Sequence, residues 1–129
     1  MEKLNPLFVL IGRILVAALF LPAGISKIGN YSGMQQYMES VGIPGIILPL
    51  VIILEVGGGL ALIVGWQTRI AAFLLAGFCV VSGILFHFQP EDQVQMILLM
   101  KNIAVAGGLL ILVGVGAGAY SLDHRKSSD

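Results

Sequence analysis

The sequence predicts an all-α integral membrane protein, a four-helix bundle with a short interfacial helix between its first two spans. Of its 129 residues, 57% are hydrophobic and only 11% are charged. A soluble domain of this size could not cover so much apolar surface with polar side chains. Four mostly apolar stretches of about 20 residues follow one another, each long enough to cross a hydrocarbon core of about 30 Å.

The four stretches account for almost the whole chain, so we expect a single transmembrane domain over residues 1–129. The expected spans cover residues 7–28, 46–65, 69–88 and 96–119. The first resembles a signal peptide, but it is long and carries Arg13 within it, which favours a retained helix. The short turn Trp66–Thr68 makes the second and third spans antiparallel neighbours.

Residues 30–42, between the first two spans, are too polar to cross a bilayer. Within them apolar side chains recur at helical spacing: Met34, Tyr37, Met38 and Val41. Ser32 and Gln35 have the spacing of a capping box at the start of this segment. We therefore expect a short helix lying on the outer membrane surface, with a plain re-entry loop as the alternative.

Lysine and arginine residues near the span ends predict the orientation. The side of the chain termini carries Lys3, Arg69, Arg125 and Lys126. The other side carries Lys27 and Lys101, together with the acidic Glu39, Glu91 and Asp92. Under the positive-inside rule both termini are expected to face the cytoplasm. Seven basic and seven acidic residues give zero formal charge, which does not indicate a nucleic-acid partner.

The second and fourth spans contain similar sequences. Residues 55–65 and 104–114 align without gaps, at an offset of 104 − 55 = 49, and share six of eleven residues. With a weaker match between the first and third spans, this similarity predicts two duplicated hairpins related as parallel repeats. Chance similarity between low-complexity stretches is the alternative. In this arrangement Gly57–Gly59 and Gly107–Gly108 would form the close-contact seams of the bundle.

Glu55 is the most informative residue, because it lies near the middle of an otherwise apolar span. A carboxylate at that depth costs about 2.5 kcal/mol or more unless it is paired, protonated or hydrated. Gly58, Gly59 and Leu62 follow it at helical spacing, so it is expected to face other helices rather than lipid. The same spacing predicts the close-packing faces of two other spans: the stripe Arg13, Ala17, Phe20, Gly24 and Lys27 on the first, and Lys101, Ala104 and Gly108 on the fourth. Arg13 is the expected partner of Glu55, and a purely structural ion pair is the alternative to a working site.

Further polar groups fall near the outer end of the bundle: Lys27, His87, Lys101 and Asn102. Together they would form an electropositive pocket with Glu55 at its floor. His87 could exchange a proton near neutral pH, and Lys101 could stabilise a developing anion. Alternatively, the lysines extend to the lipid headgroups and His87 is an interfacial residue.

The sequence contains no motif for a resident haem, flavin or metal centre, so we expect no metal site. The single Cys79 excludes an internal disulfide, and two histidines cannot complete a cysteine-rich zinc or iron–sulfur site. Cys79 is expected to be a small core residue. Electrons would have to come from a partner protein or a diffusing quinone, and the cofactor stays open.

Several of these segments, in their order and spacing, resemble the DoxX family of small bacterial four-helix membrane proteins. They are Arg13, Ala23–Lys27, Glu55–Gly59, Gly65-x-x-Thr68-Arg69, Leu85–His87, Lys101–Asn102, Gly107–Gly108 and Ser121–Asp123. The resemblance covers almost the whole chain and implies a multi-pass protein of the bacterial inner membrane, associated with oxidoreductase systems. Some relatives are described as the membrane subunit of a thiosulfate:quinone oxidoreductase or as quinol-oxidase components. For many members no reaction is assigned.

The leading hypothesis is a membrane subunit of a quinone-linked oxidoreductase system that binds quinone or a small anionic reductant. The expected catalytic residues are Glu55 and His87. The expected ligand-binding residues are Arg13, Lys27, Lys101 and Asn102. The alternative is a non-catalytic protein, either a pathway for small molecules or ions or a scaffold of a membrane redox complex. The expected partners are the lipid bilayer, a redox protein and, for transport, further copies of the chain.

Overall fold

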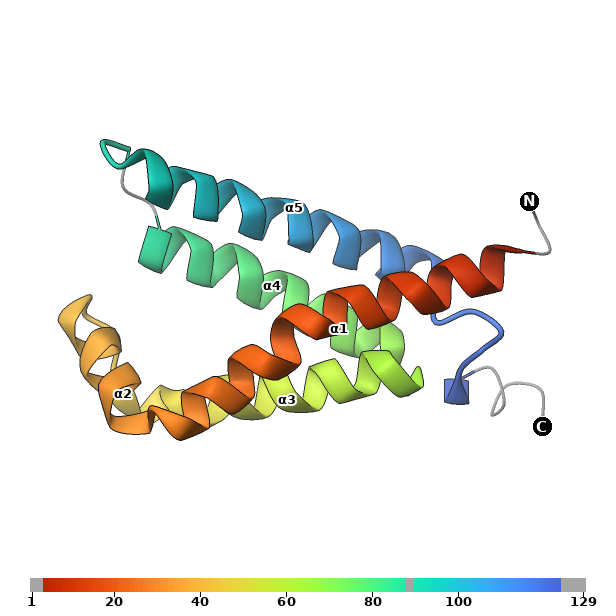
Figure 1. The fold of residues 1–129 in the computed structure, drawn as a ribbon, viewed down its shortest axis with the longest axis horizontal. Coiled ribbons are helices and arrows are strands. Elements are labelled where there is room, and N and C mark those ends of the chain that lie inside the picture. Colours follow the sequence, from red (N-terminus) through yellow and green to blue (C-terminus); the bar gives the residue numbers. More distant parts are fainter. Residues whose placement is uncertain (1–3, 88–89, 124–129) are drawn as a thin grey trace.

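The computed structural model describes residues 4–87 and 90–123, and all regular structure in this part of the chain is helical (Figure 1). The long helices are α1 (Asn5–Gly29), α3 (Leu48–Val64), α4 (Thr68–His87) and α5 (Gln93–Val115). The short elements are α2 (Tyr31–Ser40) and the 3₁₀ turn η2 (Gly45–Ile47). Four helical segments are long and apolar enough to cross a membrane. The predicted all-α membrane bundle is confirmed.

The helix boundaries lie close to the predicted span ends, except at the end of α5. This helix ends at Val115 and not at Ala119, because Gly116 and Gly118 have positive φ values of 80° and 83°. Glycine adopts such values without a steric penalty and commonly ends helices in this way. The helix also begins before the predicted span, where the side chain of Asp92 accepts hydrogen bonds from the first turn.

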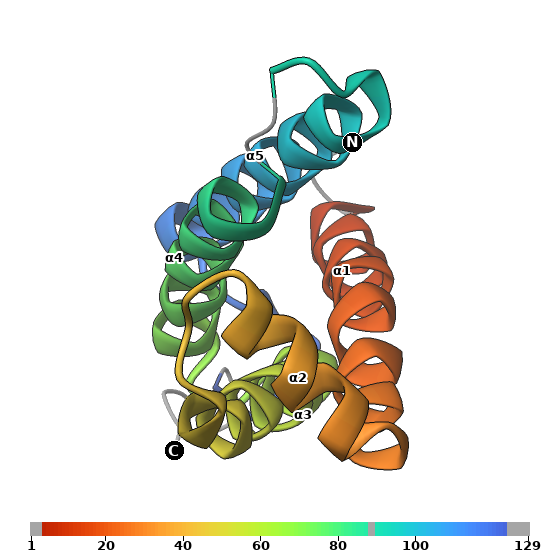
Figure 2. The same ribbon diagram turned by 90° about the vertical axis from the view of Figure 1, so that its left-hand side faces the viewer.

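The long helices form a curved row in which α1 packs on α3, α3 on α4, and α4 on α5 (Figures 1 and 2). At one end of the bundle α2 lies across the row (Figure 2). We call this the α2 end, and the opposite end, where α1 begins and α5 ends, the terminal end. The first and last helices of the row, α1 and α5, diverge toward the α2 end.

The buried face of α1 is the stripe predicted from helical spacing, and it consists of Arg13, Ala17, Phe20 and Gly24. On α3 the predicted face is also buried, since Glu55, Gly59 and Leu62 point into the bundle. The core around these two stripes is completed by small and branched residues of α4 and α5: Ala71, Ala72, Leu75, Ala76, Cys79, Ala106, Leu109 and Leu112.

The predicted face of α5 is wrong. Lys101, Ala104 and Gly108 were expected to pack against other helices, yet all three are exposed. The buried residues of this helix are Leu99, Ala106, Leu109 and Leu112. The packing of α5 on α4 therefore uses larger side chains, and the small residues face outward.

The glycine seams are correspondingly unequal. A Cβ added at Gly58 would lie 3.0 Å from Leu75, and one at Gly59 would lie 3.4 Å from Leu21, so both glycines sit in close helix contacts. No atom lies within 4 Å of a Cβ added at Gly107 or Gly108. The seam predicted on α3 is present at its last two glycines, whereas the seam predicted on α5 is wrong.

The short helix between the first two spans is confirmed as α2, with Met38 on its buried side. The predicted capping box does not form, because the helix begins at Tyr31 and its N-cap, Asn30, makes no side-chain capping bond. The side chain of Gln35 points elsewhere and donates to the carbonyl oxygen of Gly45 at 3.3 Å. This bond fastens α2 to η2, at the start of the second span.

Candidate functional site

Arg13 is 1% exposed and is held by backbone carbonyl groups. Its Nη1 donates to the carbonyl oxygens of Leu62 at 2.8 Å and Ile63 at 3.3 Å, and its Nη2 donates to that of Tyr120 at 2.5 Å. The first two carbonyls belong to the last turn of α3, where they have no partner within the helix. Arg13 therefore caps α3 and ties it to α1 and to the segment after α5.

Asp123 and Arg13 together form a polar layer at the terminal end of the bundle. The carboxylate of Asp123 accepts hydrogen bonds from the backbone N–H groups of Gln67 at 2.8 Å and Thr68 at 2.9 Å, at the start of α4. Its own N–H donates to the carbonyl oxygen of Gly65 at 2.8 Å. A carboxylate in this position caps the helix and interacts favourably with the helix dipole. The residues after α5 thus fasten the turn between α3 and α4.

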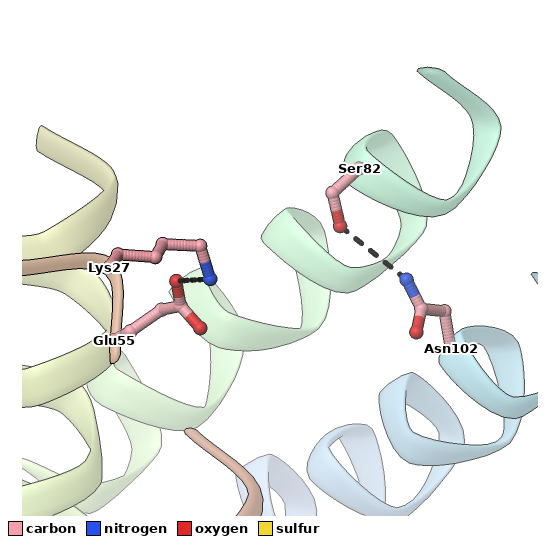
Figure 3. Close-up of polar contacts among 4 residues, drawn as sticks. All are labelled: Lys27, Glu55, Ser82 and Asn102. Carbon is pink, nitrogen blue, oxygen red and sulfur yellow. Dashed lines mark hydrogen bonds and ion pairs between the residues drawn. The ribbon is translucent and has the colours of Figure 1, made fainter. Parts of the chain in front are cut away.

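The predicted pair between Arg13 and Glu55 is wrong. Glu55 pairs with Lys27, whose Nζ lies 2.5 Å from Oε1 (Figure 3). Because α1 and α3 are antiparallel, Arg13 lies beside the last turn of α3, whereas Lys27 lies beside its first half. Both basic residues share the buried side of α1, and helix direction decides which one meets the carboxylate.

Gly24 makes this ion pair sterically accessible. A Cβ added there would lie 2.7 Å from Cγ2 of Val56 and 3.1 Å from Cβ of Glu55. The absence of a side chain thus lets α1 approach α3 beside the carboxylate, so that Lys27, three residues further on, can reach it.

A cavity of about 320 Å³ lies at the α2 end and is lined by residues from all five α-helices. This volume is near the lower limit for small-molecule sites, roughly 300–1,000 Å³. Most of its wall is apolar. The polar residues that line it are Lys27, Tyr37, Glu55, Ser82, Lys101 and Asn102. The structure therefore brings four of the predicted pocket residues to one cavity.

Two polar pairs face each other across this space (Figure 3). On one side is the ion pair of Lys27 and Glu55, whose side chains are 20% and 4% exposed. On the other side, Nδ2 of Asn102 donates to Oγ of Ser82 at 3.5 Å and to the carbonyl oxygen of Cys79 at 3.2 Å. The hydrogen bonds of the Asn102 side chain join α5 to α4, as the ion pair joins α1 to α3.

Lys101 is the remaining cation of the cavity, and it is exposed. Among the side chains that the structure describes, which do not include that of His87, it makes no ion pair or hydrogen bond. Because the charges of Lys27 and Glu55 offset each other, the described lining carries a net positive charge. Lys101 lies eight residues after the start of α5, about 12 Å along the helix axis. A lone cation at such a depth in a membrane span is unfavourable without a partner.

The short helix α2 covers the cavity at its end. Met34, Tyr37 and Met38 line the space from this side. The ring of Tyr37 stacks on that of Phe86 in α4, with centroids 5.3 Å apart and an interplanar angle of 15°. The stack connects α2 to the half of the bundle that it does not adjoin in sequence.

Comparison with known proteins agrees with this architecture. The sequence profile described as DoxX matches residues 8–88. The chain belongs to the DoxX family. It is 49% identical over 124 residues to inner membrane protein YqjF of Escherichia coli K12, covering 96% of this chain and 95% of that protein. Inner membrane protein YphA of the same strain is 34% identical over 128 residues, covering 94% and 91%.

A more distant DoxX relative is the Bacillus subtilis protein named "Putative oxidoreductase CatD". It is 26% identical over 110 residues, covering 82% of each chain. No solved structure matches the chain.

Sequence reasoning missed several lining residues of this DoxX cavity. Ser82 and Phe86 follow Cys79 on α4 at intervals of three and four residues, so helical spacing places all three on one face. Cys79 is buried, as predicted, and it also lines the cavity. His87 ends α4, but its side chain lies outside the described part of the structure. The described residues contain no cluster that could bind a metal ion.

Proposed function

We propose that this DoxX protein is the membrane subunit of a quinone-linked oxidoreductase system and that quinone or a small anionic reductant binds in the cavity. The observation that supports this function is an apolar-walled cavity, within the spans, that holds a buried ion pair and Lys101, which has no partner among the residues that the structure describes. Apolar walls with a few placed polar groups are typical of small-molecule sites. A quinone oxygen or an anion would accept a charge-assisted hydrogen bond from the ammonium group.

The proposed roles follow from position. Lys101 and Asn102 would hold the polar edge of the ligand, and Lys27 would fix the carboxylate of Glu55. Reduction of a quinone takes up protons as well as electrons, and Glu55 and His87 are the proposed groups for proton exchange. Arg13 is no longer proposed as a ligand-binding residue, because it does not line the cavity and its guanidinium group donates hydrogen bonds to backbone carbonyl groups. Electrons would come from a redox partner or a soluble reductant.

The relatives support a membrane location more directly than they support a reaction. Two Escherichia coli relatives are named inner membrane proteins, and the Bacillus subtilis relative carries the name "Putative oxidoreductase CatD". We place this chain in a bacterial inner membrane, with both termini in the cytoplasm because of its Lys and Arg distribution. A reporter fused after Asp129 that is active only in the periplasm would contradict this orientation.

Native mass spectrometry of gently extracted protein tests the function. We expect the wild type to retain a quinone, and Lys101→Gln to lose it. Arg69→Gln is the matched control, because Arg69 is an exposed cation at the terminal end and does not line the cavity. Protein that retains no quinone, but gives solute flux in liposomes without redox change, would favour a permeation pathway. A protein with neither property would favour a scaffold.

A further inference from the structure

The helices around the cavity leave one side unpacked. α1 packs on α3, α3 on α4, and α4 on α5, whereas α1 and α5 diverge toward the α2 end (Figures 1 and 2). The end of the bundle is covered by α2, whose Tyr37 stacks on Phe86 of α4. The side between α1 and α5 is therefore the one that helix packing does not close.

Exposure of the lining residues agrees with an opening on this side. Leu19 of α1 is 37% exposed, and Lys101 of α5 is exposed. By contrast, the lining residues Glu55 of α3 and Cys79 of α4 are each 3% exposed. These residues of α1 and α5 thus reach the surface beside the cavity, whereas those of α3 and α4 do not; at its end, Tyr37 of α2 is also exposed, at 45%.

The depth of these residues indicates what lies outside the opening. Leu19 lies ten residues before the end of α1, and Lys101 lies eight residues after the start of α5. At about 1.5 Å per residue, both are roughly 12–15 Å along their helices from the α2 end. Both helices are apolar enough to span a bilayer, so an opening at this level faces acyl chains and not water.

We propose that the cavity takes its ligand directly from the bilayer, through the opening between Leu19 and Lys101, and that this ligand is a long-tailed amphiphile with a hydrogen-bond-accepting head. The inference rests on the proposed function and narrows it, because it favours a membrane-dissolved quinone over a water-soluble anion. The head would supply the acceptor that Lys101 lacks, the apolar wall would hold the ring, and the tail would remain among the lipids.

Cys79 is a built-in reporter of this route, since it lines the cavity and is the single cysteine of the chain. In proteoliposomes, a bilayer-dissolved N-alkyl maleimide should label Cys79, and a charged, water-soluble methanethiosulfonate should not. Leu19→Trp should slow labelling by about tenfold, because the larger side chain narrows the opening. Leu15→Trp is the matched control, since Leu15 lies one turn away, is 67% exposed and does not line the cavity. The mass of the intact protein reports the labelling.

Three results would contradict lateral entry, that is, entry of the ligand from the bilayer through the opening between α1 and α5. They are labelling of the wild type by the charged reagent, equal labelling rates in the two Trp variants, and no labelling by the alkyl reagent under conditions that label the unfolded chain. A long-tailed quinone added to the bilayer separates this inference from the proposed function. Protection of Cys79 by the quinone supports both. Lateral labelling without protection supports the route and contradicts quinone binding.

Discussion

The two polar layers of the bundle differ in how their charges are satisfied. At the terminal end, Arg13 is bonded to carbonyl groups of α3 and of the segment after α5, and Asp123 caps α4. At the α2 end, Lys27 and Glu55 neutralise each other, while Lys101 has no partner among the described residues and borders a cavity. The first layer is completed by the chain itself, and the second retains a charge and a space for a ligand.

This difference shows that the role of a buried charge in a membrane span is indicated by the groups around it and not by its depth. Depth alone marks Arg13 and Glu55 as functional candidates of equal weight, because each would be unfavourable in hydrocarbon. Their surroundings distinguish them. A guanidinium that bonds the terminal carbonyls of a neighbouring helix holds the fold together, whereas charged groups that line a cavity with one unpartnered cation are arranged for a ligand.

The largest expected effect is on the terminal layer. Arg13→Met should lower the free energy of unfolding by about 3 kcal/mol or more, because it leaves the buried carbonyl group of Leu62 and the part-buried one of Tyr120 without a donor. Denaturation of the protein in detergent micelles measures this loss. Arg69→Met, at an exposed position of the same end, should change it by less than about 0.5 kcal/mol. Equal losses would show that the Arg13 bonds do not hold the layer together.

The next effect concerns the ion pair of the α2 end. Lys27→Met should destabilise the protein by about 2 kcal/mol, because Glu55 is left buried without its partner, and adding Glu55→Gln should recover part of the loss. In a second double-mutant cycle, the losses of stability caused by Arg13→Met and by Glu55→Gln should be additive within about 0.5 kcal/mol. Coupling of Glu55 to Arg13, without coupling to Lys27, would contradict the pairing in the structure.

The sequence predicted the spans and two buried faces, because hydrophobicity sets the spans and polar residues mark the faces. The stripe through Arg13 on α1 and the face of Glu55 on α3 are both confirmed. On α5 the same reasoning failed. Lipid-facing and protein-facing side chains are both apolar in a membrane, so periodicity cannot separate them, and the preference for small residues at helix contacts pointed to the wrong side.

The cavity was predicted better than the bonds within it. Lys27, Glu55, Lys101 and Asn102 were expected at one site because their depths agree, and they line one cavity. The partner of Arg13 could not be predicted, because backbone carbonyls are acceptors at every residue and leave no signal in the sequence. The capping role of Asp123 also depends on the path of the chain after Gly116, which residue types alone do not specify.

A loss of similar size should distinguish the closed side of the α2 end from the outward face of α5. Gly24→Ala should destabilise by about 2 kcal/mol, because its Cβ would lie 2.7 Å from Val56 and force α1 away from α3. Gly108→Ala should be neutral or stabilising by up to about 1 kcal/mol, since that position is open and alanine favours the helix. Thermal unfolding in detergent compares the two. A larger loss at Gly108 would indicate that a neighbouring molecule covers this face.

The smallest expected effect on stability belongs to Lys101, and it completes the contrast with Arg13. Lys101→Gln removes a charge that makes no bond within the described chain, so the free energy of unfolding should change by less than about 0.5 kcal/mol. Quinone affinity should fall by about tenfold, or about 1.4 kcal/mol, because the ligand loses a charge-assisted hydrogen bond. Titration of quinone into nanodiscs measures the affinity, and Lys101→Arg, which keeps the charge, should retain most of it. If Lys101→Gln instead unfolded the protein as readily as Arg13→Met, Lys101 would belong to the structural framework, and the distinction between the two layers would fail.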